Sequence, residues 1–375
     1  GRIESVASGV PRLDYYTSGG TAGCPALLVE PSGSNLCLQS QDFTTTWSPT
    51  NVTVSANVTG TTDPFGTNLA EQLFETTTSG LHFLAQTMSI TSGTTYAGSI
   101  FFKKAAGSPD WMQVAFSTTG LAGFANFNLT SGTVGNVGAG CTGRIENYGN
   151  GWYRCTLIQT ATASGTSGGP IPAFINNTDS VTRFVSYAGS TATSIYIFGA
   201  QLETGTVPTS YIPTTTASAT RNADNISLSG AVSGCVGQTE GTIYAEVDLR
   251  ALSVARSIFG VSLNSNTTDF ANIQINSSNR IFARIRSNTG TVQDVTASST
   301  VTGTTKIAMA YDSSGSVLAI NGAIIGTNAS GIASWSSGVN FVHVGNGPSA
   351  ASGSSQGGFF NDRILAPVLY TTRLT

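Results

Sequence analysis

Charged side chains are scarce in this chain of 375 residues. Asp, Glu, Lys and Arg together make up 9% of it, and there are only two histidines, whereas an average soluble protein is about 25% charged. The formal net charge is −3. With so few cations and no basic run, the sequence lacks the electrostatic footprint of a nucleic-acid-binding protein. It also lacks a run of about 18 apolar residues, so we expect no membrane insertion.

Cysteines with metal-binding spacing are missing as well. The five cysteines are Cys24, Cys37, Cys141, Cys155 and Cys235, and no two of them form a CxxC motif, which argues against a zinc ribbon. Cys24 could pair with Cys37, and Cys141 with Cys155, under oxidising conditions. Each also fits as a small buried apolar residue, and the sequence leaves both alternatives open.

What the chain does contain is glycine, aromatic residues and small polar residues. It has 44 glycines, 18 phenylalanines and 11 tyrosines, and apolar residues make up 39%. Thr, Ser, Asn and Gly are weak helix formers, whereas this mixture is typical of many short strands joined by tight turns. We therefore predict an all-β protein, with two jelly-roll-type antiparallel β-sandwiches in tandem and an extended N-terminal arm.

Shifts in composition predict where these parts begin and end. Residues 1–40 are broken by Gly, Pro and Ser yet include the apolar stretches LDYY and ALLVE, which predicts an arm that docks on another surface. We expect residues 41–213 to form the first sandwich and 229–375 the second. Between them, residues 214–228 begin with a Thr/Ser/Ala run that has little to bury, so we expect a linker there.

Alternating apolar and polar residues predict individual strands. In the first sandwich we expect strands at residues 68–75, 81–90, 95–103, 112–118, 123–128, 152–160, 183–187 and 194–202. In the second sandwich the strand segments are TIYAEVDL, SIFGVSL, NIQINSS, RIFARIRS, KIAMAYD, VLAINGAIIG, NFVHVGN and ILAPVLYTTRL. Asn321-Gly322, inside one of these segments, is a strong signal for a two-residue hairpin turn.

Several stretches resemble a family of phage virion proteins when taken in order. They are SGVPRLDY, ALLVEPSGSNL, GNGWYRCTL, IYIFGAQLETG, TSYIPT and ATRNAD, followed by TIYAEVDL and VLYTTRL in the second half. Ser34 departs from the family, which usually has Thr at that position. The resemblance implies a carbohydrate-binding-module-like sandwich followed by a concanavalin A-like (laminin-G-like) sandwich, in tail-fibre, head-fibre or spike proteins that are often trimeric. It implies no catalytic site.

One carboxylate pair is a candidate for glycoside hydrolysis. Glu246 and Asp248 lie two residues apart on a predicted strand, so their side chains share a face. Some concanavalin A-like glycosidases use a Glu-x-Asp-x-x-Glu strand, in which the two outer glutamates act as nucleophile and acid. In this chain the third position is Ala251, so the acid is missing. The alternative is a solvated strand face with Arg250 as the partner, and we expect no enzyme activity from this pair.

Histidine and aspartate offer only weak candidates for other chemistry. His82 and His343 both lie in β-patterned stretches, where a satisfied strand histidine is the expected role rather than a catalytic base. No cofactor is predicted, although sandwich loops often hold a structural calcium ion through Asp and backbone oxygens. Asp269 and Asp362 are the weak metal candidates.

Carbohydrate binding needs aromatic faces for stacking and planar polar groups for hydroxyls. Among the four tryptophans, Trp152 lies in the middle of a predicted strand and is expected in the core. Trp111 and Trp335 lie near predicted loops and are the carbohydrate-binding candidates, although either can instead anchor its loop.

The leading functional hypothesis is a phage virion protein, a tail or head fibre or spike, that adheres to host-surface polysaccharide. The expected setting is the virion surface, with other virion proteins as partners and a homotrimer as the assembly. One alternative is a purely structural decoration or fibre-attachment protein without a ligand. The other is a polysaccharide depolymerase.

Overall fold

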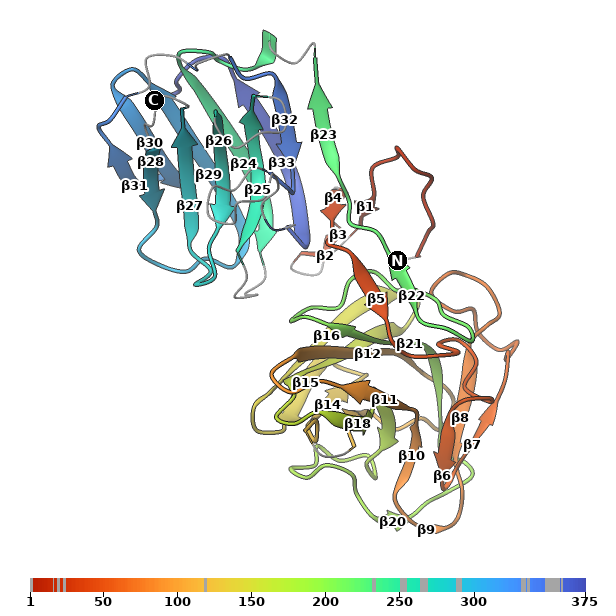
Figure 1. Cartoon of the computed structure of the whole chain (residues 1–375). Helices are drawn as coiled ribbons and strands as arrows, with labels where there is room; N and C mark the ends of the chain where they lie inside the picture. The colour runs from red at the N-terminus through yellow and green to blue at the C-terminus, as the bar shows by residue number, and fades with distance from the viewer. Residues whose placement is uncertain are drawn as a thin grey trace. The chain divides into compact units, whose positions relative to one another are not determined.

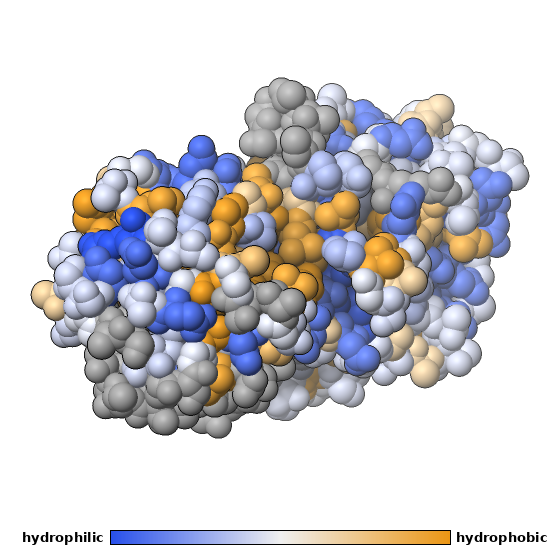
Figure 2. Space-filling view, turned by 90° about the horizontal axis from the view of Figure 1, so that it is seen from above, coloured by the Kyte–Doolittle hydropathy of each residue, from blue (hydrophilic) through white to orange (hydrophobic). Residues whose placement is uncertain are grey.

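The computed structural model describes residues 3–15, 17–18, 21–22, 25–117, 120–230, 234–249, 255–263, 269–287, 292–331, 335, 338–347, 358 and 360–375. Regular structure in these residues is almost entirely β-strand, arranged in antiparallel sheets, with no α-helix (Figure 1). None of these residues belongs to a helix long and apolar enough to cross a membrane. The predicted all-β sandwich class is confirmed. Pale, weakly hydrophilic residues cover much of the surface seen in Figure 2, in keeping with a chain that relies on Ser, Thr and Gly instead of charge.

The chain forms two compact units, and each of them is discontinuous in sequence. Unit 1 contains Gly1–Ser5 and Gly33–Arg221, and unit 2 contains Val6–Ser32 and Asn222–Thr375. The main segment of unit 1, Gly33–Arg221, thus lies between the two segments of unit 2 in the sequence. The division differs from the predicted series of arm, sandwich, linker and sandwich.

Unit 1 is built on two six-stranded sheets with small two-stranded additions. One sheet runs β16 (Cys141–Gly149), β17 (Trp152–Thr160), β12 (Thr95–Lys104), β21 (Ser194–Thr204), β8 (Glu71–Glu75) and β7 (Val52–Ser55). The other runs β15 (Thr133–Val137), β14 (Phe124–Asn128), β13 (Trp111–Ala115), β19 (Ile171–Phe174), β10 (His82–Ala85) and β6 (Ser48–Thr50). The small pairs are β11 (Thr87–Ile90) with β18 (Gly165–Gly168), β9 (Ser79–Gly80) with β20 (Tyr187–Ala188), and β5 (Gly33–Asn35) with β22 (Ala219–Arg221).

Unit 2 has a seven-stranded and a six-stranded sheet. The first runs β1 (Leu13–Asp14), β4 (Ala26–Val29), β33 (Asp362–Tyr370), β24 (Gly241–Leu249), β29 (Gly303–Asp312), β30 (Gly315–Ile320) and β31 (Ala323–Asn328). The second runs β23 (Ile226–Ser229), β32 (Phe341–Val344), β25 (Arg256–Ser262), β26 (Phe270–Ile275), β27 (Ile281–Arg286) and β28 (Val292–Thr296). Strands β2 (Thr17–Ser18) and β3 (Thr21–Ala22) form a separate pair.

Each unit has its own hydrophobic core, formed by alternate residues of its strands. In unit 1, inward side chains such as Ile100 and Met112 are fully buried, and in unit 2 Ile273 and Ile307 are too. Each such side chain contributes about 1.5–3 kcal/mol on burial. Two separate cores explain why two units form from one chain.

The predicted N-terminal arm belongs in large part to the unit 2 sheet. Strand β4 pairs with the C-terminal strand β33, with Leu27 opposite Ile364, and β1 extends the sheet beyond β4 (Figure 1). Val29 is fully buried in the unit 2 core. A Cβ added at Gly345 would lie 2.4 Å from the Val29 side chain, so a glycine is needed there for the close approach. The apolar stretch ALLVE therefore has its docking surface within unit 2.

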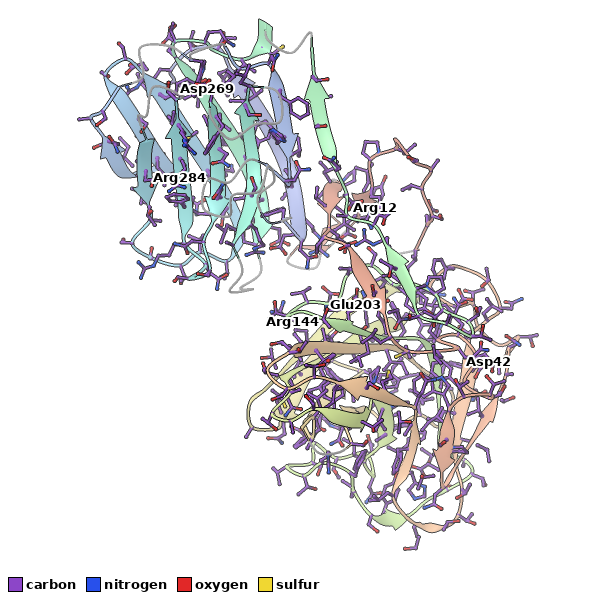
Figure 3. The ribbon with its side chains drawn as sticks, in the orientation of Figure 1. Arg12, Asp42, Arg144, Glu203, Asp269 and Arg284 are labelled. Atoms are coloured by element: carbon purple, nitrogen blue, oxygen red, sulfur yellow. The ribbon has the colours of Figure 1, made fainter. Side chains whose placement is uncertain are left out.

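Charged side chains fix this N-terminal segment to the chain that returns from unit 1. The Arg12 guanidinium pairs with Glu30 at 2.8 Å and with Asp224, and the Asp224 carboxylate also accepts a hydrogen bond from the Glu30 amide at 2.8 Å (Figure 3 labels Arg12). Removing Arg12 would leave the buried Glu30 carboxylate beside the partly buried Asp224 carboxylate, with no cation between them. The three residues hold together segments that are about 200 positions apart in sequence.

The predicted linker is likewise divided in the structure. Thr214 is buried in unit 1, where its amide donates to the Ser40 hydroxyl and its own hydroxyl donates to the Cys37 carbonyl. Residues 215–218 are exposed, and β22 then pairs with β5. Residues 215–218 are the longest exposed run within the predicted linker that lies outside a strand, and they match the expectation of an accessible segment.

Most predicted strands are present, and so is the predicted hairpin turn. Asn321 and Gly322 have φ values of 51° and 83°, as a two-residue hairpin turn of this type requires, and Ile320 pairs with Ala323 across it. The prediction of a strand over residues 183–187 was wrong, because only Tyr187 belongs to one. The preceding residues instead form part of a segment that crosses a sheet.

Candidate functional site

The outer face of the β15-β14-β13-β19-β10-β6 sheet of unit 1 carries an unusual group of polar and aromatic residues. Along β13, Met112 and Val114 point into the core and are fully buried, so Trp111, Gln113 and Ala115 point outward. The cross-strand pairing of β14, β13, β19 and β10 places four outward residues in one row. They are Asn126, Gln113, Ala173 and Phe83.

Residues 176–186, called here the covering segment, cross this face and are tied to it by buried amides. Gln113 and Asn126 are both fully buried. The Asn126 amide donates to the Asp179 carboxylate at 2.9 Å and to the Ser180 carbonyl at 2.7 Å. The Gln113 amide donates to Asn126 at 2.8 Å and to the Thr182 carbonyl at 3.2 Å. The segment is thus fixed by satisfied hydrogen bonds.

Phe184, near the end of the covering segment, has a strained backbone. Its φ is 59°, in the left-handed region that a bulky side chain rarely adopts. Its amide donates to the Gln113 side chain at 2.8 Å, and its ring stacks on Phe83 with centroids 5.0 Å apart and planes 26° apart. Strain of this kind costs about 1–3 kcal/mol and tends to persist at functional positions.

An arginine completes what we call the aromatic platform, which is Phe83, Arg183 and Phe184. The Arg183 guanidinium lies 5.4 Å from the Phe184 ring centroid and donates to the Phe116 carbonyl at 2.9 Å. All three platform side chains are partly exposed, and the platform rests on a small apolar cluster that includes Phe124. Aromatic faces beside hydrogen-bond donors are the chemistry that sugar binding requires.

Trp111 lies on the same outer face, as a partly exposed residue. Its amide donates to Asn177 at 3.2 Å. A Cβ added at Gly135 would lie 2.5 Å from the Trp111 ring and 2.3 Å from the Asp179 carboxylate, so ring and carboxylate both pack over this glycine. Trp111 therefore supports the covering segment while leaving part of its ring accessible.

Trp335 has a different environment from the one predicted. It is 5% exposed and packs in the unit 2 core, where its ring makes an edge contact with Tyr311 at 5.8 Å and its indole nitrogen donates to the Gly237 carbonyl at 3.3 Å. The Ser and Gly residues around Trp335 predict a loop, but the indole ring is buried among the apolar side chains of the core. A ring with neither face accessible cannot stack on a sugar.

The platform residues were not found from the sequence as site residues. Arg183 and Phe184 lie within the strand predicted over residues 183–187, and Phe83 lies within the strand predicted over residues 81–90. One signal was available in the run NNTDS before them, since Asn176 and Asn177 both have positive φ and Asn favours such turns. That run marks a turn-rich segment, but not the face it crosses.

The residues that carry the sequence resemblance in unit 1 hold the fold together. Asn35 is fully buried and donates to the carbonyls of Ala200 and Ile212. The Glu203 carboxylate, labelled in Figure 3, accepts from the amide and hydroxyl of Thr209, both at 2.7 Å. Burial raises the pKa of Glu203. These polar side chains fasten β5 and the chain after β21, so they are structural.

The two carboxylates of the unit 2 pair each have a neighbouring polar partner. Glu246 and Asp248 point to the same side of β24, and Asp248 is ion-paired with Arg363 at 3.3 Å. Glu246 lies 3.5 Å from the Tyr244 hydroxyl. Arg250 and Ala251 lie outside the described residues.

His82 and His343 are both buried and hydrogen-bonded. His82 lies 2.9 Å from the Asn51 carbonyl and 3.2 Å from the Tyr187 carbonyl. The His343 Nε2 atom lies 2.8 Å from the Ser262 hydroxyl, a spacing that nucleophilic catalysis also uses. Ser262 is fully buried, however, so it offers a substrate no access.

The metal candidates do not form a site within the described part of the chain. Asp362 is ion-paired with Arg256 at 2.6 Å, with both side chains buried, and Asp269 is fully buried. Among the described residues no group of three or more His, Cys, Asp or Glu side chains could hold a metal ion.

The cysteines that the structure describes are free thiols. Cys141 lies opposite Gln159 and Cys155 opposite Ile145 in the β16–β17 hairpin, so the two are four register positions apart and do not pair. Cys37 is also free, and Cys24 lies outside the described residues.

Comparison with known proteins identifies no family for this chain. No protein-family model matches it, and no curated protein does. Among solved structures, it is similar to a Ruminococcus gnavus IT-sialidase CBM40 bound to α2,6 sialyllactose, at 18% identity and a TM-score of 0.31, over 40% of this chain and 92% of that one. It is also similar to domains LG4-5 of the mouse laminin α1 chain, at 12% identity and a TM-score of 0.30, over 78% and 86% of the two chains. TM-scores near 0.3 are too low for any ligand to be transferred.

Proposed function

We propose that this protein is a non-catalytic phage virion protein that holds host-surface glycan on the outer face of unit 1, at the aromatic platform. The observation that supports this most directly is Phe184. The Phe184 backbone is held in a conformation that is costly for a bulky residue. In this conformation its ring stacks on Phe83, and both rings stay partly exposed.

The chemistry around the platform suits a sugar ring. Phe83 and Phe184 offer apolar faces for C–H groups, and Arg183 offers donors for hydroxyls. Trp111 is a second partly exposed aromatic residue on the same outer face, two residues along β13 from the buried Gln113. A longer glycan that contacts both the platform and Trp111 has to pass over the covering segment, which is bonded to Gln113.

A glycan array with the full chain, followed by calorimetric titration of the strongest ligand, tests this proposal. Phe83→Ala should weaken binding at least tenfold, about 1.4 kcal/mol. The matched control is Tyr370→Ala, because Tyr370 is also exposed, at 42%, but lies in unit 2. Equal losses in both variants, or no array signal from folded protein, would contradict the proposal. Release of reducing ends from a bound polymer would favour the depolymerase alternative.

We further propose that the protein assembles as a homotrimer through the N-terminal segment. Although β1 and β4 pair within unit 2, four large side chains of that segment stay exposed, namely Val6 at 41%, Val10 at 53%, Leu13 at 51% and Tyr15 at 69%. Burying each of them would contribute about 1.5–3 kcal/mol. A contact with another subunit would explain why four large apolar side chains within ten positions are exposed in the single chain.

Light scattering after size exclusion tests this assembly. Substitution is preferable to deletion, because deleting the segment removes two strands of unit 2. The triple variant V10S/L13S/Y15S should be monomeric, whereas Ile324→Ser, which alters a side chain 70% exposed elsewhere in unit 2, should remain trimeric. A monomeric wild-type chain contradicts the proposal. Antibody labelling of purified virions tests display on the particle.

A further inference from the structure

The outer face of the six-stranded sheet of unit 2 carries a row of arginines on one strand. In β27 the residues Ile281, Ala283 and Ile285 point inward and are at most 2% exposed. Phe282, Arg284 and Arg286 therefore point outward, and Arg280 precedes them on the same side. Figure 3 labels Arg284 on this strand. We call these four outward residues the arginine row.

Arg284 is fixed and neutralised by its neighbours. Its Nε and Nη2 atoms donate to the two carboxylate oxygens of Asp294, both at 2.7 Å, from the position directly opposite on β28. Its guanidinium also lies 4.9 Å from the Phe282 ring centroid. The hydrogen bonds to Asp294 raise the pKa of Arg284. A bidentate pair stacked on a ring is a rigid element of this face.

Arg286 has no such partner. It lies opposite Phe270 on β26 and Val292 on β28, and it forms no hydrogen bond or ion pair with any residue that the structure describes. Asp294, the acid across from the row, already has both oxygens bonded to Arg284. Arg286 is partly buried, so its five donors are only partly hydrated and lack an anion.

We propose that the arginine row is a second binding site, specific for a carboxylated sugar, with the carboxylate on Arg286 and the sugar ring beside Phe282. A planar guanidinium presents two parallel N–H donors that match the two oxygens of a carboxylate. The fixed pair of Arg284 and Asp294 supplies polar groups for hydroxyls next to that position. This site extends the proposed glycan adhesion but does not depend on the aromatic platform of unit 1.

The small net charge of the face argues against a nucleic acid as its ligand. Three arginines against one aspartate leave a local excess of two positive charges, within a chain of net charge −3. Nucleic-acid binding draws on many cations that track a backbone. Two charges beside an aromatic ring are too few for that role, and they suit a sugar polymer with one carboxylate per unit or at its end.

Calorimetric titration of the full chain tests the inference with three probes, which are polygalacturonate, hyaluronan and polysialic acid oligosaccharides. Each probe is paired with its carboxyl-reduced form, which differs only in charge. The wild-type chain should bind at least one carboxylated probe at least tenfold more tightly than the reduced form. The absence of a preference for all three carboxylated probes overturns the inference.

Matched variants then locate the site. Arg286→Gln should weaken binding of the carboxylated probe about tenfold and leave the reduced probe unchanged, and Arg286→Lys, which keeps the charge without the planar fork, should recover only part of the loss. Lys306→Gln removes one positive charge from the other sheet of unit 2, where Lys306 is exposed, and should change affinity less than twofold. Equal losses for Arg286→Gln and Lys306→Gln would show that net charge alone is responsible, which overturns the inference.

A variant of the other unit separates this inference from the proposed function. Phe83→Ala should leave the carboxylate preference intact even where it weakens overall glycan binding. If Phe83→Ala removes that preference and Arg286→Gln does not, the carboxylate binds in unit 1 and the arginine row is not the site.

Discussion

Glu71 is a buried carboxylate whose pKa lies close to neutral pH. It is 1% exposed, and burial raises its pKa to about 7, although its carboxylate accepts a hydrogen bond from the Phe43 amide at 3.0 Å. Because the folded pKa is above the unfolded value of about 4.5, the folded state binds the proton more tightly. The stability contribution is therefore complete below about pH 4.5 and is lost as the pH rises to about 7.

The variant Glu71→Gln should remove this pH dependence, because the amide is neutral and still offers an oxygen to Phe43. We expect equal stability of variant and wild type near pH 4.5, and a more stable variant at pH 8, by on the order of 2–3 kcal/mol. Urea unfolding at both pH values, followed by hydrogen exchange of unit 1 core amides, measures the difference. Parallel pH profiles for the two proteins would show that Glu71 is ionised when folded.

His343 gives unit 2 a pH dependence of the opposite sign. Burial lowers its pKa to about 4 from the ordinary 6.5, so the unfolded chain takes up a proton more readily than the folded one. The contribution of His343 is complete above about pH 6.5 and is lost as the pH falls toward 4. His343→Gln keeps a hydrogen-bonding group near Ser262 without titrating, so its unit 2 should lose less stability than wild type between pH 7 and 4.5, by on the order of 2 kcal/mol. Hydrogen exchange of β26 amides reports on this unit, and identical losses would contradict the assignment.

At the scale of elements, alternation in the sequence was enough to find the long central strands. The stretch from Trp152 to Thr160 forms a strand with the predicted bounds. Strand β16 was missed, because its residues are mostly half-exposed and include glycines, so no apolar face stands out. The pairing of β4 with β33 joins residues more than 330 positions apart, and no local pattern encodes such a partner.

The covering segment shows why the candidate site was harder to predict than the strands. A strand is specified by which residues are apolar, whereas this segment is specified by buried amides on the sheet beneath it. Gln113 and Asn126 look in sequence like ordinary polar strand residues on a solvated face. Only the structure shows that both are fully buried and bonded to residues about 53–71 positions further on.

Asp179→Ala tests how this segment is held. The Asp179 carboxylate accepts from the Asn136 amide at 2.7 Å and from the Asn126 side chain at 2.9 Å. Losing two hydrogen bonds to a charged group should cost about 2–4 kcal/mol and leave a buried amide donor with one acceptor fewer. We expect faster hydrogen exchange in residues 176–186 with the β12 amides unchanged, together with weaker glycan binding. The control Asp110→Ala alters an exposed carboxylate and should leave exchange in residues 180–186 unaffected.

At the scale of the whole molecule, the chain enters and leaves unit 1 at adjacent points. Strand β5, just after the chain passes from Ser32 of unit 2 to Gly33 of unit 1, pairs with β22, just before the chain returns to unit 2 at Asn222. Beyond the crossings, the Asp224 amide donates to the Glu30 carbonyl at 2.9 Å within unit 2. A discontinuous unit of this kind requires both of its chain segments for a complete sheet.

This connectivity makes a specific prediction for limited proteolysis. Residues 215–218 are exposed, so a protease should cut there. For two domains in tandem, one cut would release two pieces. Here the N-terminal fragment keeps β1 and β4, and β4 pairs with β33 of the C-terminal fragment. It also keeps β5, which pairs with β22. The fragments should therefore co-elute in native size exclusion and separate only under denaturing conditions. The variant Leu27→Asp places a charge in the β4–β33 pairing, so it should promote separation of the fragments. Two fragments that elute apart for the wild-type chain would show that the N-terminal strands contribute little to unit 2.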